Sequence, residues 1–259
     1  MVNRTIVTTS WDDGDPLDLQ LAEKLRDAGL AATFYVPIFG QHGKPTLLPE
    51  DLRDLNSQGF EVGAHTMTHA NLSALRGQRL WAEVFDCKQA LEQTLSKQVP
   101  MFCYPCGRYN AEVLASVRKA GYRGARTTRM LCHQTSFSAF EMPTTLQAYP
   151  HGSFTYYKNL GKRRDVAGLY RYVFELRRLQ RWVDLGKRLF DQVLEQGGIW
   201  HLYGHSWEIE ELGLWDGLTE VLDYVALRPG VSYLANGPAV QMRKNELAGV
   251  TCAVHQTIL

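Results

Sequence analysis

Short apolar runs alternate with amphipathic stretches along most of this chain, and this alternation is the feature that most restricts the fold. Apolar residues between the runs recur at helical spacing, as at Leu17, Leu21 and Leu25. Strands that alternate with helices form a parallel sheet covered by helices, either closed as a βα-barrel or open and doubly wound. The predicted strands are residues 4–11, 31–38, 60–65, 101–104, 122–128, 142–147, 198–205 and 231–235.

Glycine, proline and capping residues set the expected helix boundaries between these strands. The first helix ends at Gly29, and Asn110 caps the fourth. No linker, repeat or low-complexity segment interrupts the pattern, so we expect residues 1–259 to form a single domain. The other predicted helices span residues 49–59 and 73–95, one or two segments within 165–196, and 214–227.

Composition excludes several classes of protein. The chain is 45% hydrophobic and 21% charged with a net charge of +1, which is ordinary for a globular domain and favours no nucleic-acid partner. No apolar run approaches the ~20 residues of a membrane span, and the first residues do not resemble a secretory signal. The five cysteines are scattered rather than arranged as a disulfide framework. These features predict a cytoplasmic protein with reduced thiols and no transmembrane segment.

Chemically reactive residues fall where the predicted strands end. In a βα-barrel, the carboxyl ends of all strands share one face, which holds the active site. Residues far apart in the sequence are therefore expected to converge. They are Asp12 and Asp13 after the first strand, His65 at the end of the third, Cys106 after the fourth and His205 at the end of 198–205.

Two histidines have a spacing that suits a metal ion. His65 and His69 lie four residues apart, so a helical turn would place both imidazoles on one face. Imidazoles and a carboxylate suit zinc and similar divalent metals, and a catalytic site needs three protein ligands. Asp12 or Asp13 could be the third. Either motif alone is weak, because a lone H-x-x-x-H arises by chance and a lone D-D-G is usually a turn.

Four segments resemble, in order, the motifs of the polysaccharide deacetylases, also called NodB-like deacetylases or carbohydrate esterase family four. The resemblance spans roughly residues 5–240 and implies a distorted (β/α)7-type barrel. Four motifs in the family's order are far more specific than any one of them. The segments are SWDDGD at 10–15, HTMTH at 65–69, FCYPCGRY at 102–109 and WHLYGH at 200–205.

The resemblance implies a role for each matching residue. Asp12 becomes the general base and His205 the general acid. The metal ligands become Asp13, His65 and His69, and the ion is usually Zn²⁺, with Co²⁺ or Ni²⁺ as alternatives. The backbone N–H of Cys106 becomes an oxyanion donor, with Gly107 beside it in the substrate-binding loop.

The sequence departs from the family pattern at three positions. Cys103 stands where the family has an arginine that orients the base, and we expect Arg126 to substitute for it. His201 and Tyr203 replace leucines that shape the pocket for the acetyl methyl, so formyl, acetyl and cyclic amides all remain open.

Several other residues have two possible roles. Tyr203 and Trp207 could stack on a sugar ring or belong to the core. Glu208 and Glu210 could orient His201 or His205, or be exposed. The segment 158–188 holds ten Lys or Arg against three acidic residues. It is either a solvated helical face or a patch for an anionic ligand, such as a nucleotide- or lipid-linked sugar or an anionic membrane. We expect residues 150–196 to be a variable, basic helical insertion.

The combined interpretation is a metal-dependent hydrolase that removes an N-acetyl or similar N-acyl group from a sugar or carbohydrate precursor. One alternative is an allantoinase-like amidohydrolase of the same fold that acts on a small cyclic amide. A second alternative is a non-catalytic carbohydrate-binding barrel. The sequence predicts neither the sugar nor the oligomeric state.

Overall fold

Parallel strands form one curled sheet in the computed structural model, which describes residues 4–40, 43–133, 136–162, 164–176, 179 and 181–242. Along the sheet the strand order is β5-β4-β3-β2-β1-β7-β6, and β8 pairs with β1. The strands are β1 Thr5–Asp12, β2 Ala32–Val36, β3 Glu61–Ala64, β4 Met101–Cys103, β5 Gly124–Arg126, β6 Leu146–Gln147, β7 Gly198–Gly204 and β8 Val231–Tyr233.

Strand β1 lies at the centre of this sheet and is buried along its whole length. One edge of β1 pairs with β7. The other edge is shared, because residues 5–7 pair with β8 and residues 9–12 pair with β2. Near the two ends of the strand order, Arg126 at the end of β5 forms a parallel bridge with Met142, which precedes β6. The predicted distorted (β/α) barrel is therefore confirmed.

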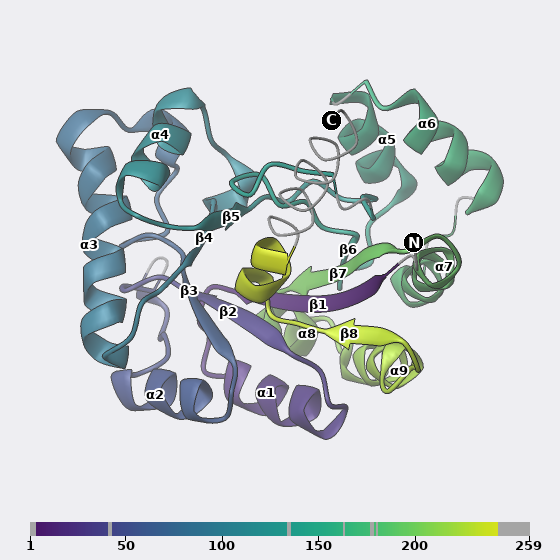
Figure 1. Cartoon of the computed structure of the whole chain (residues 1–259), viewed down its shortest axis with the longest axis horizontal. Coiled ribbons are helices and arrows are strands. Elements are labelled where there is room, and N and C mark those ends of the chain that lie inside the picture. The colour runs from purple at the N-terminus through teal and green to yellow at the C-terminus, as the bar shows by residue number, and fades with distance from the viewer. Residues whose placement is uncertain are drawn as a thin grey trace, which may run out of the picture.

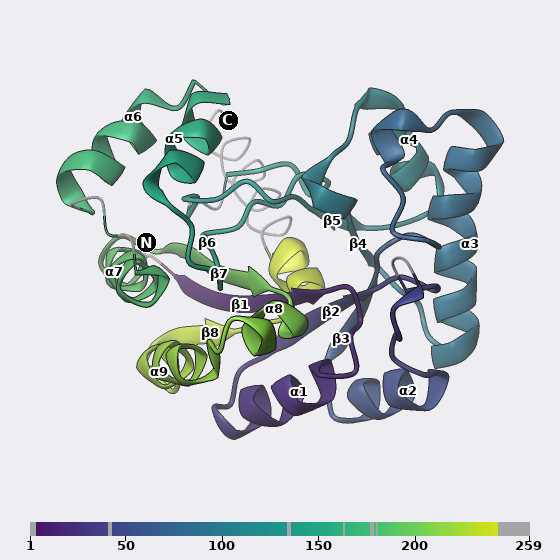
Figure 2. The ribbon, with the colours of Figure 1, turned by 180° about the vertical axis from the view of Figure 1, so that it is seen from behind.

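Helices surround the outside of the curled sheet, with α1 to α4 on one side and α7 and α9 on the other (Figures 1 and 2). None of the helices in the described ranges is long and apolar enough to cross a bilayer. The helices are α1 Asp18–Asp27, α2 Pro49–Ser57, α3 Gly77–Leu95, α4 Ala111–Lys119, α5 Ser153–Lys162, α6 Val166–Tyr170, α7 Trp182–Gln196, α8 Ser206–Glu211 and α9 Trp215–Val225.

Two hydrophobic layers hold this arrangement together. Side chains of β1 alternate between them, as expected for a strand buried on both faces. Val7 and Trp11 join the large core between the sheet and the helices. Ile6 points the other way, into a smaller cluster in the barrel interior that includes Ala239 and Val240 from the segment after β8. That segment also bonds to the starts of β2 and β3, because Asn236 N donates to Thr33 Oγ1 and Gly237 N donates to Glu61 Oε2, each at 2.9 Å.

The structure differs from the sequence prediction at two helices. The predicted helix 73–95 is interrupted, because Leu72–Ala74 forms a separate 3₁₀ turn and Gly77, with φ of +55°, stands where α3 begins. A positive φ is incompatible with the interior of a right-handed helix. Helix α5 lies within the expected helical insertion 150–196, whereas α8, which is only six residues long, was not predicted.

The predicted cap of α4 is confirmed, because the Asn110 side chain accepts a hydrogen bond of 3.0 Å from the backbone N–H of Val113. We expect Asn110→Ala to lower the free energy of unfolding by about 1 kcal/mol, because that N–H loses its partner. Urea denaturation measures the loss. Asn110→Ser retains an oxygen acceptor and should lose markedly less, and equal losses in the two variants would contradict a capping role.

Candidate active site

A tight turn at the end of β1 presents the carboxylate of Asp13. Both Asp13 and Gly14 have positive φ, at 80° and 63°, and a Cβ on Gly14 would lie 2.7 Å from Val36 Cγ1. The Asp13 N–H donates to Tyr35 O at 3.1 Å, which ties the turn to β2. The Trp207 indole N–H donates to Asp13 Oδ2 at 3.0 Å. One carboxylate oxygen is therefore held by Trp207, and the other faces the histidines.

The loop after β3 positions His65 and His69, but not as the predicted helical turn. Thr66 and His69 have positive φ, at 73° and 55°, so the two imidazoles approach through a folded loop. Glu83 of α3 holds this loop by accepting hydrogen bonds from Thr68 N at 3.0 Å and from Thr68 Oγ1 at 2.7 Å. The spacing of four residues correctly predicted that the rings of His65 and His69 lie close together. The predicted helical turn between them is wrong.

The three predicted metal ligands converge. Asp13 Oδ1 lies 3.3 Å from His69 Nε2 and 3.7 Å from His65 Nε2. The three ligand atoms all lie within 4.8 Å of one another. His65 Nδ1 must donate its hydrogen to Cys103 O, at 2.9 Å, because a carbonyl only accepts, and this leaves a lone pair on Nε2.

The unpaired atoms of this group fit a divalent cation. Asp13 Oδ1 is buried, and within the described part of the chain it has no hydrogen-bond partner. A buried carboxylate oxygen without a donor is costly unless a cation faces it. Burial also lowers the pKa of His65 to about 4, so this imidazole is neutral at pH 7, as a metal ligand must be.

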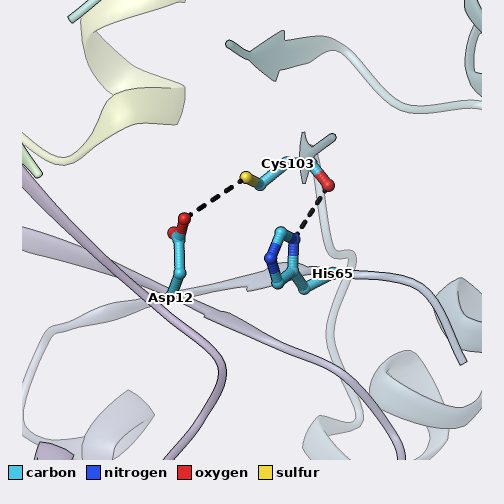
Figure 3. A group of neighbouring side chains, drawn as sticks. All are labelled: Asp12, His65 and Cys103. Atoms are coloured by element: carbon cyan, nitrogen blue, oxygen red, sulfur yellow. Dashed lines mark hydrogen bonds between the residues drawn. The ribbon is translucent and has the colours of Figure 1, made fainter. Parts of the chain in front are cut away.

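Asp12 lies beside this group, buried in the barrel interior and paired with a guanidinium. Arg126, from the end of β5, donates from Nη2 to Asp12 Oδ1, and the Cys103 thiol lies 3.7 Å from Asp12 Oδ2 (Figure 3). The guanidinium lies between the rings of Tyr35 and Tyr203, at 5.3 and 4.7 Å from their centroids. Burial alone would raise the pKa of Asp12, but Arg126 outweighs it and lowers this pKa to about 2.

His205 follows β7 on the opposite side of Asp13, with its Nε2 3.9 Å from Asp13 Oδ2. Its Nδ1 donates to Glu208 Oε2 at 2.6 Å. Burial lowers the pKa of His205, but the hydrogen bond to Glu208 and the charges of Asp12 and Asp13 outweigh burial and raise this pKa to about 9. His205 is therefore charged at neutral pH, with Nε2 directed at the metal-ligand group.

The predicted substrate-binding residues are placed differently from one another. Tyr203 is buried, and its hydroxyl donates to Gln147 Oε1 at 2.8 Å. Cys106 is exposed in the 3₁₀ turn Pro105–Gly107 after β4, with φ of 53°. Gly107, with φ of +64°, packs so closely on Thr128 that a Cβ would lie 2.1 Å from Thr128 Oγ1. This turn lies at the same edge of the sheet, outside the network of carboxylates and imidazoles.

Sequence reasoning missed two supporting residues and left a third open. Glu83 holds the histidine loop, and Gln147 donates to Glu208 Oε2 at 3.1 Å, yet neither residue belongs to a motif. Glu208 had been one of two candidates to orient a histidine, and it contacts His205. His201 is buried in a separate role, because its Nε2 lies 2.8 Å from Ser10 Oγ and its Nδ1 donates to Pro143 O at 3.1 Å.

Fold and site together define a barrel-type protein whose reactive groups lie at the carboxyl edge of a parallel sheet. The polysaccharide deacetylase family model matches residues 2–125. Over 123 residues, 47% of this chain, the sequence is 31% identical to a peptidoglycan-N-acetylglucosamine deacetylase of Bacillus cereus, 55% of which is covered. Over 122 residues, again 47% of this chain, it is 29% identical to a chitooligosaccharide deacetylase of Rhizobium leguminosarum bv. trifolii, also covered to 55%. The chain spans about half the length of these relatives.

Solved structures show that the likeness in fold extends over nearly the whole chain. A protein from Mycobacterium smegmatis superposes with a TM-score of 0.69 at 14% identity, covering 94% of this chain and 92% of that one. The chitin deacetylase of Colletotrichum lindemuthianum superposes with a TM-score of 0.58 at 17% identity, covering 92% and 88%. Residues 2–125 are therefore similar to the polysaccharide deacetylase family, and the likeness in fold extends beyond them.

We expect Glu208→Gln to lower the pKa of His205 by at least about one unit, because the variant removes the negative charge and keeps an oxygen that can accept from Nδ1. NMR titration of the imidazole in metal-free protein measures the shift from a starting value of about 9. Glu210→Gln is the matched control, since Glu210 accepts from Trp215 rather than from His205. An unchanged His205 titration in Glu208→Gln would contradict this assignment.

Proposed function

We propose that this protein is a metal-dependent hydrolase that removes the N-acetyl group of a sugar by cleaving its linear amide bond. The observation that supports this most strongly is the buried oxygen of Asp13, which faces His65 and His69 without a hydrogen-bond donor. Asp12 and His205 lie on either side of it with shifted pKa values. A ligand group flanked by an ionised carboxylate and a charged imidazole suits amide hydrolysis.

In this proposal Asp13, His65 and His69 hold one divalent ion. Two imidazoles and a carboxylate leave a coordination position open, as catalytic zinc sites do, and Co²⁺ or Ni²⁺ suits the same ligands. When bound, the ion supplies Lewis-acid chemistry, because it acidifies water and polarises a carbonyl. Trp207 holds Asp13 Oδ2, so that Oδ1 remains directed at the two imidazoles.

Two proton transfers fall to the flanking residues. Asp12 accepts the proton of the attacking water, and Arg126 keeps Asp12 ionised so that it can act as a base. His205 donates a proton from Nε2 to the leaving nitrogen, while Glu208 holds its other ring nitrogen. An amide needs this acid because its amine is a poor leaving group until it is protonated.

The substrate that we propose is an N-acylated sugar or a carbohydrate precursor. Related proteins are named for the deacetylation of peptidoglycan N-acetylglucosamine and of chitooligosaccharides. The backbone N–H of Cys106, beside Gly107, would stabilise the oxyanion. Tyr203 is held by Gln147 and Arg126, so we propose that it closes the acyl pocket from below. A cyclic amide is less favoured because these related proteins are named for acetylated sugars. A non-catalytic barrel is less favoured because a candidate acid and base lie beside the three candidate ligands.

We expect chelator-treated protein to be inactive, and about one equivalent of Zn²⁺, Co²⁺ or Ni²⁺ to restore acetate release from N-acetylated sugars. The assay should measure acetate and formate over a panel of N-acylated sugars and cyclic amides. Asp13→Ala should lose metal binding and turnover together, while Asp54→Ala on the exposed face of α2 should retain both. Absence of metal binding in the wild type would exclude the proposal. Turnover of cyclic amides alone would show that the substrate is a cyclic amide and not an N-acylated sugar.

We expect Arg126→Met to lower kcat/KM about 10²-fold at pH 6, because the pKa of Asp12 rises once burial is unopposed. The loss should shrink as pH increases and Asp12 ionises. The variant leaves Asp12 buried without its counterion, so thermal unfolding should verify that the protein remains folded. Cys103→Ser conserves the volume beside Asp12 and should retain most activity. A pH profile that is merely scaled down, with the same shape, would contradict this role of Arg126.

A further inference from the structure

The segment 153–176 exposes an unusual concentration of large apolar side chains. Among the described residues, ten large hydrophobic side chains are exposed, and five of these lie within this segment. Isolated exposed apolar residues are normal, but a cluster usually marks an interaction surface. The five are Phe154, Val166, Leu169, Tyr170 and Phe174, with exposed fractions of 76%, 77%, 40%, 59% and 65%.

Helical spacing separates the outward and inward faces of this segment. On α5, Tyr156 and Leu160 are buried, whereas Phe154, Lys158 and Lys162 recur every four residues and are exposed. The inward face is therefore already satisfied by packing. Phe154 does not belong to the core, because a different face of α5 makes the core contacts.

The same separation holds for α6 and the π-helical turn Arg171–Glu175 that follows it. Tyr172 points inward, with its ring centroid 5.2 Å from that of Tyr156. Val166, Tyr170 and Phe174 recur every four residues on the exposed side, and the ring centroids of Tyr170 and Phe174 lie 4.8 Å apart.

Positive charge accompanies these apolar residues. From Ser153 to Arg181 the sequence holds eight Lys or Arg and two acidic residues. Asp165 caps α6 by accepting from Gly168 N at 2.8 Å, and Glu175 accepts from Gln192 Nε2 at 3.2 Å, so both carboxylates have local partners. Lys158, Lys162 and Arg164 are exposed, whereas Arg163, Arg177 and Arg178 lie outside the described residues.

This segment stands at the periphery of the molecule. Figures 1 and 2 show α5 and α6 beyond β6, on the outer edge and away from α1 to α4. A cavity of about 1080 Å³, lined in part by Pro143, Val166 and Tyr170, lies between α6 and the chain that precedes β6. Val166 and Tyr170 therefore stand at the rim of this cavity, where they are 77% and 59% exposed.

We propose that the outer faces of α5, α6 and the turn Arg171–Glu175 dock the protein on the surface of an anionic lipid bilayer. Lysines attract the phosphate headgroups, while the exposed aromatic and aliphatic side chains enter the interface between headgroups and acyl chains. Protein interfaces are depleted in lysine, and nucleic-acid surfaces offer no apolar layer for Val166 and Leu169, so a lipid surface fits this combination best. This proposal does not depend on the proposed function.

Vesicle co-sedimentation tests this proposal with the full chain. We expect phosphatidylglycerol vesicles to bind the protein and phosphatidylcholine vesicles to bind it at least tenfold more weakly, with added salt reducing the difference. Lys158→Gln combined with Lys162→Gln should weaken binding roughly 25-fold, at about fivefold for each lysine. Phe154→Ser combined with Phe174→Ser should weaken it at least tenfold by removing the inserted apolar surface.

Matched variants elsewhere on the surface are the controls. Leu48→Ser with Leu227→Ser removes side chains of 55% and 78% exposure, and Arg53→Gln with Arg79→Gln removes two exposed charges. Both pairs should bind vesicles as the wild type does. Equal binding to the two lipids would overturn the proposal, as would unaltered binding by the double Phe variant. Size-exclusion chromatography adds one more outcome, since self-association that the double Phe variant abolishes, without vesicle binding, assigns the surface to a second copy instead.

Discussion

The pairing of Asp12 with Arg126 is the interaction on which the interior of the barrel depends. Asp12 ends the central strand and is 3% exposed, so its charge is tolerable only with a counterion nearby. Arg126 is fully buried as well, and two of its nitrogens, Nε and Nη1, have no hydrogen-bond partner among the described residues. The faces of Tyr35 and Tyr203 compensate in part, since a desolvated guanidinium is attracted to aromatic rings. Such a pair is a poor source of stability, and its clearest effect is to keep Asp12 ionised.

Two of the three departures from the family pattern, Cys103 and Tyr203, contact this pair. Cys103 and Arg126 are register partners across β4 and β5, so their side chains project on the same side of the sheet, toward Asp12. In this chain β5 supplies the positive charge beside one oxygen of Asp12, and the Cys103 thiol lies 3.7 Å from the other. Tyr203, where the family has leucine, covers the guanidinium with its ring. His201 remains neutral, because burial and the nearby Arg126 lower its pKa to about 3.

The sequence predicted the fold and the convergence of the site for one physical reason, which is that parallel strands bring their carboxyl ends to one edge. It could not predict the conformation between His65 and His69. Thr66 has a positive φ, and threonine usually avoids this conformation, so the residue type gives no indication of it. Glu83 and Gln147 were missed because their contacts depend on tertiary placement and not on spacing. For Trp207 the sequence left sugar stacking and a core position open, and it gave no sign that the indole N–H binds Asp13 or that Lys44 lies 4.3 Å from the ring centroid.

Adjacent aspartates acquire different chemistry because the backbone turns between them. Asp12 retains strand geometry and points into the barrel, where a guanidinium fixes its charge. Asp13 has φ of 80°, so its carboxylate leaves the plane of the strand and meets two imidazoles and an indole. Trp207 donates to one oxygen of Asp13, and the other oxygen faces the lone pair on His65 Nε2, which cannot donate to it. In the proposed metal site a cation would join this oxygen to the two imidazoles, so the orientation of Trp207 and the tautomer of His65 would belong to that site as much as the ligands do.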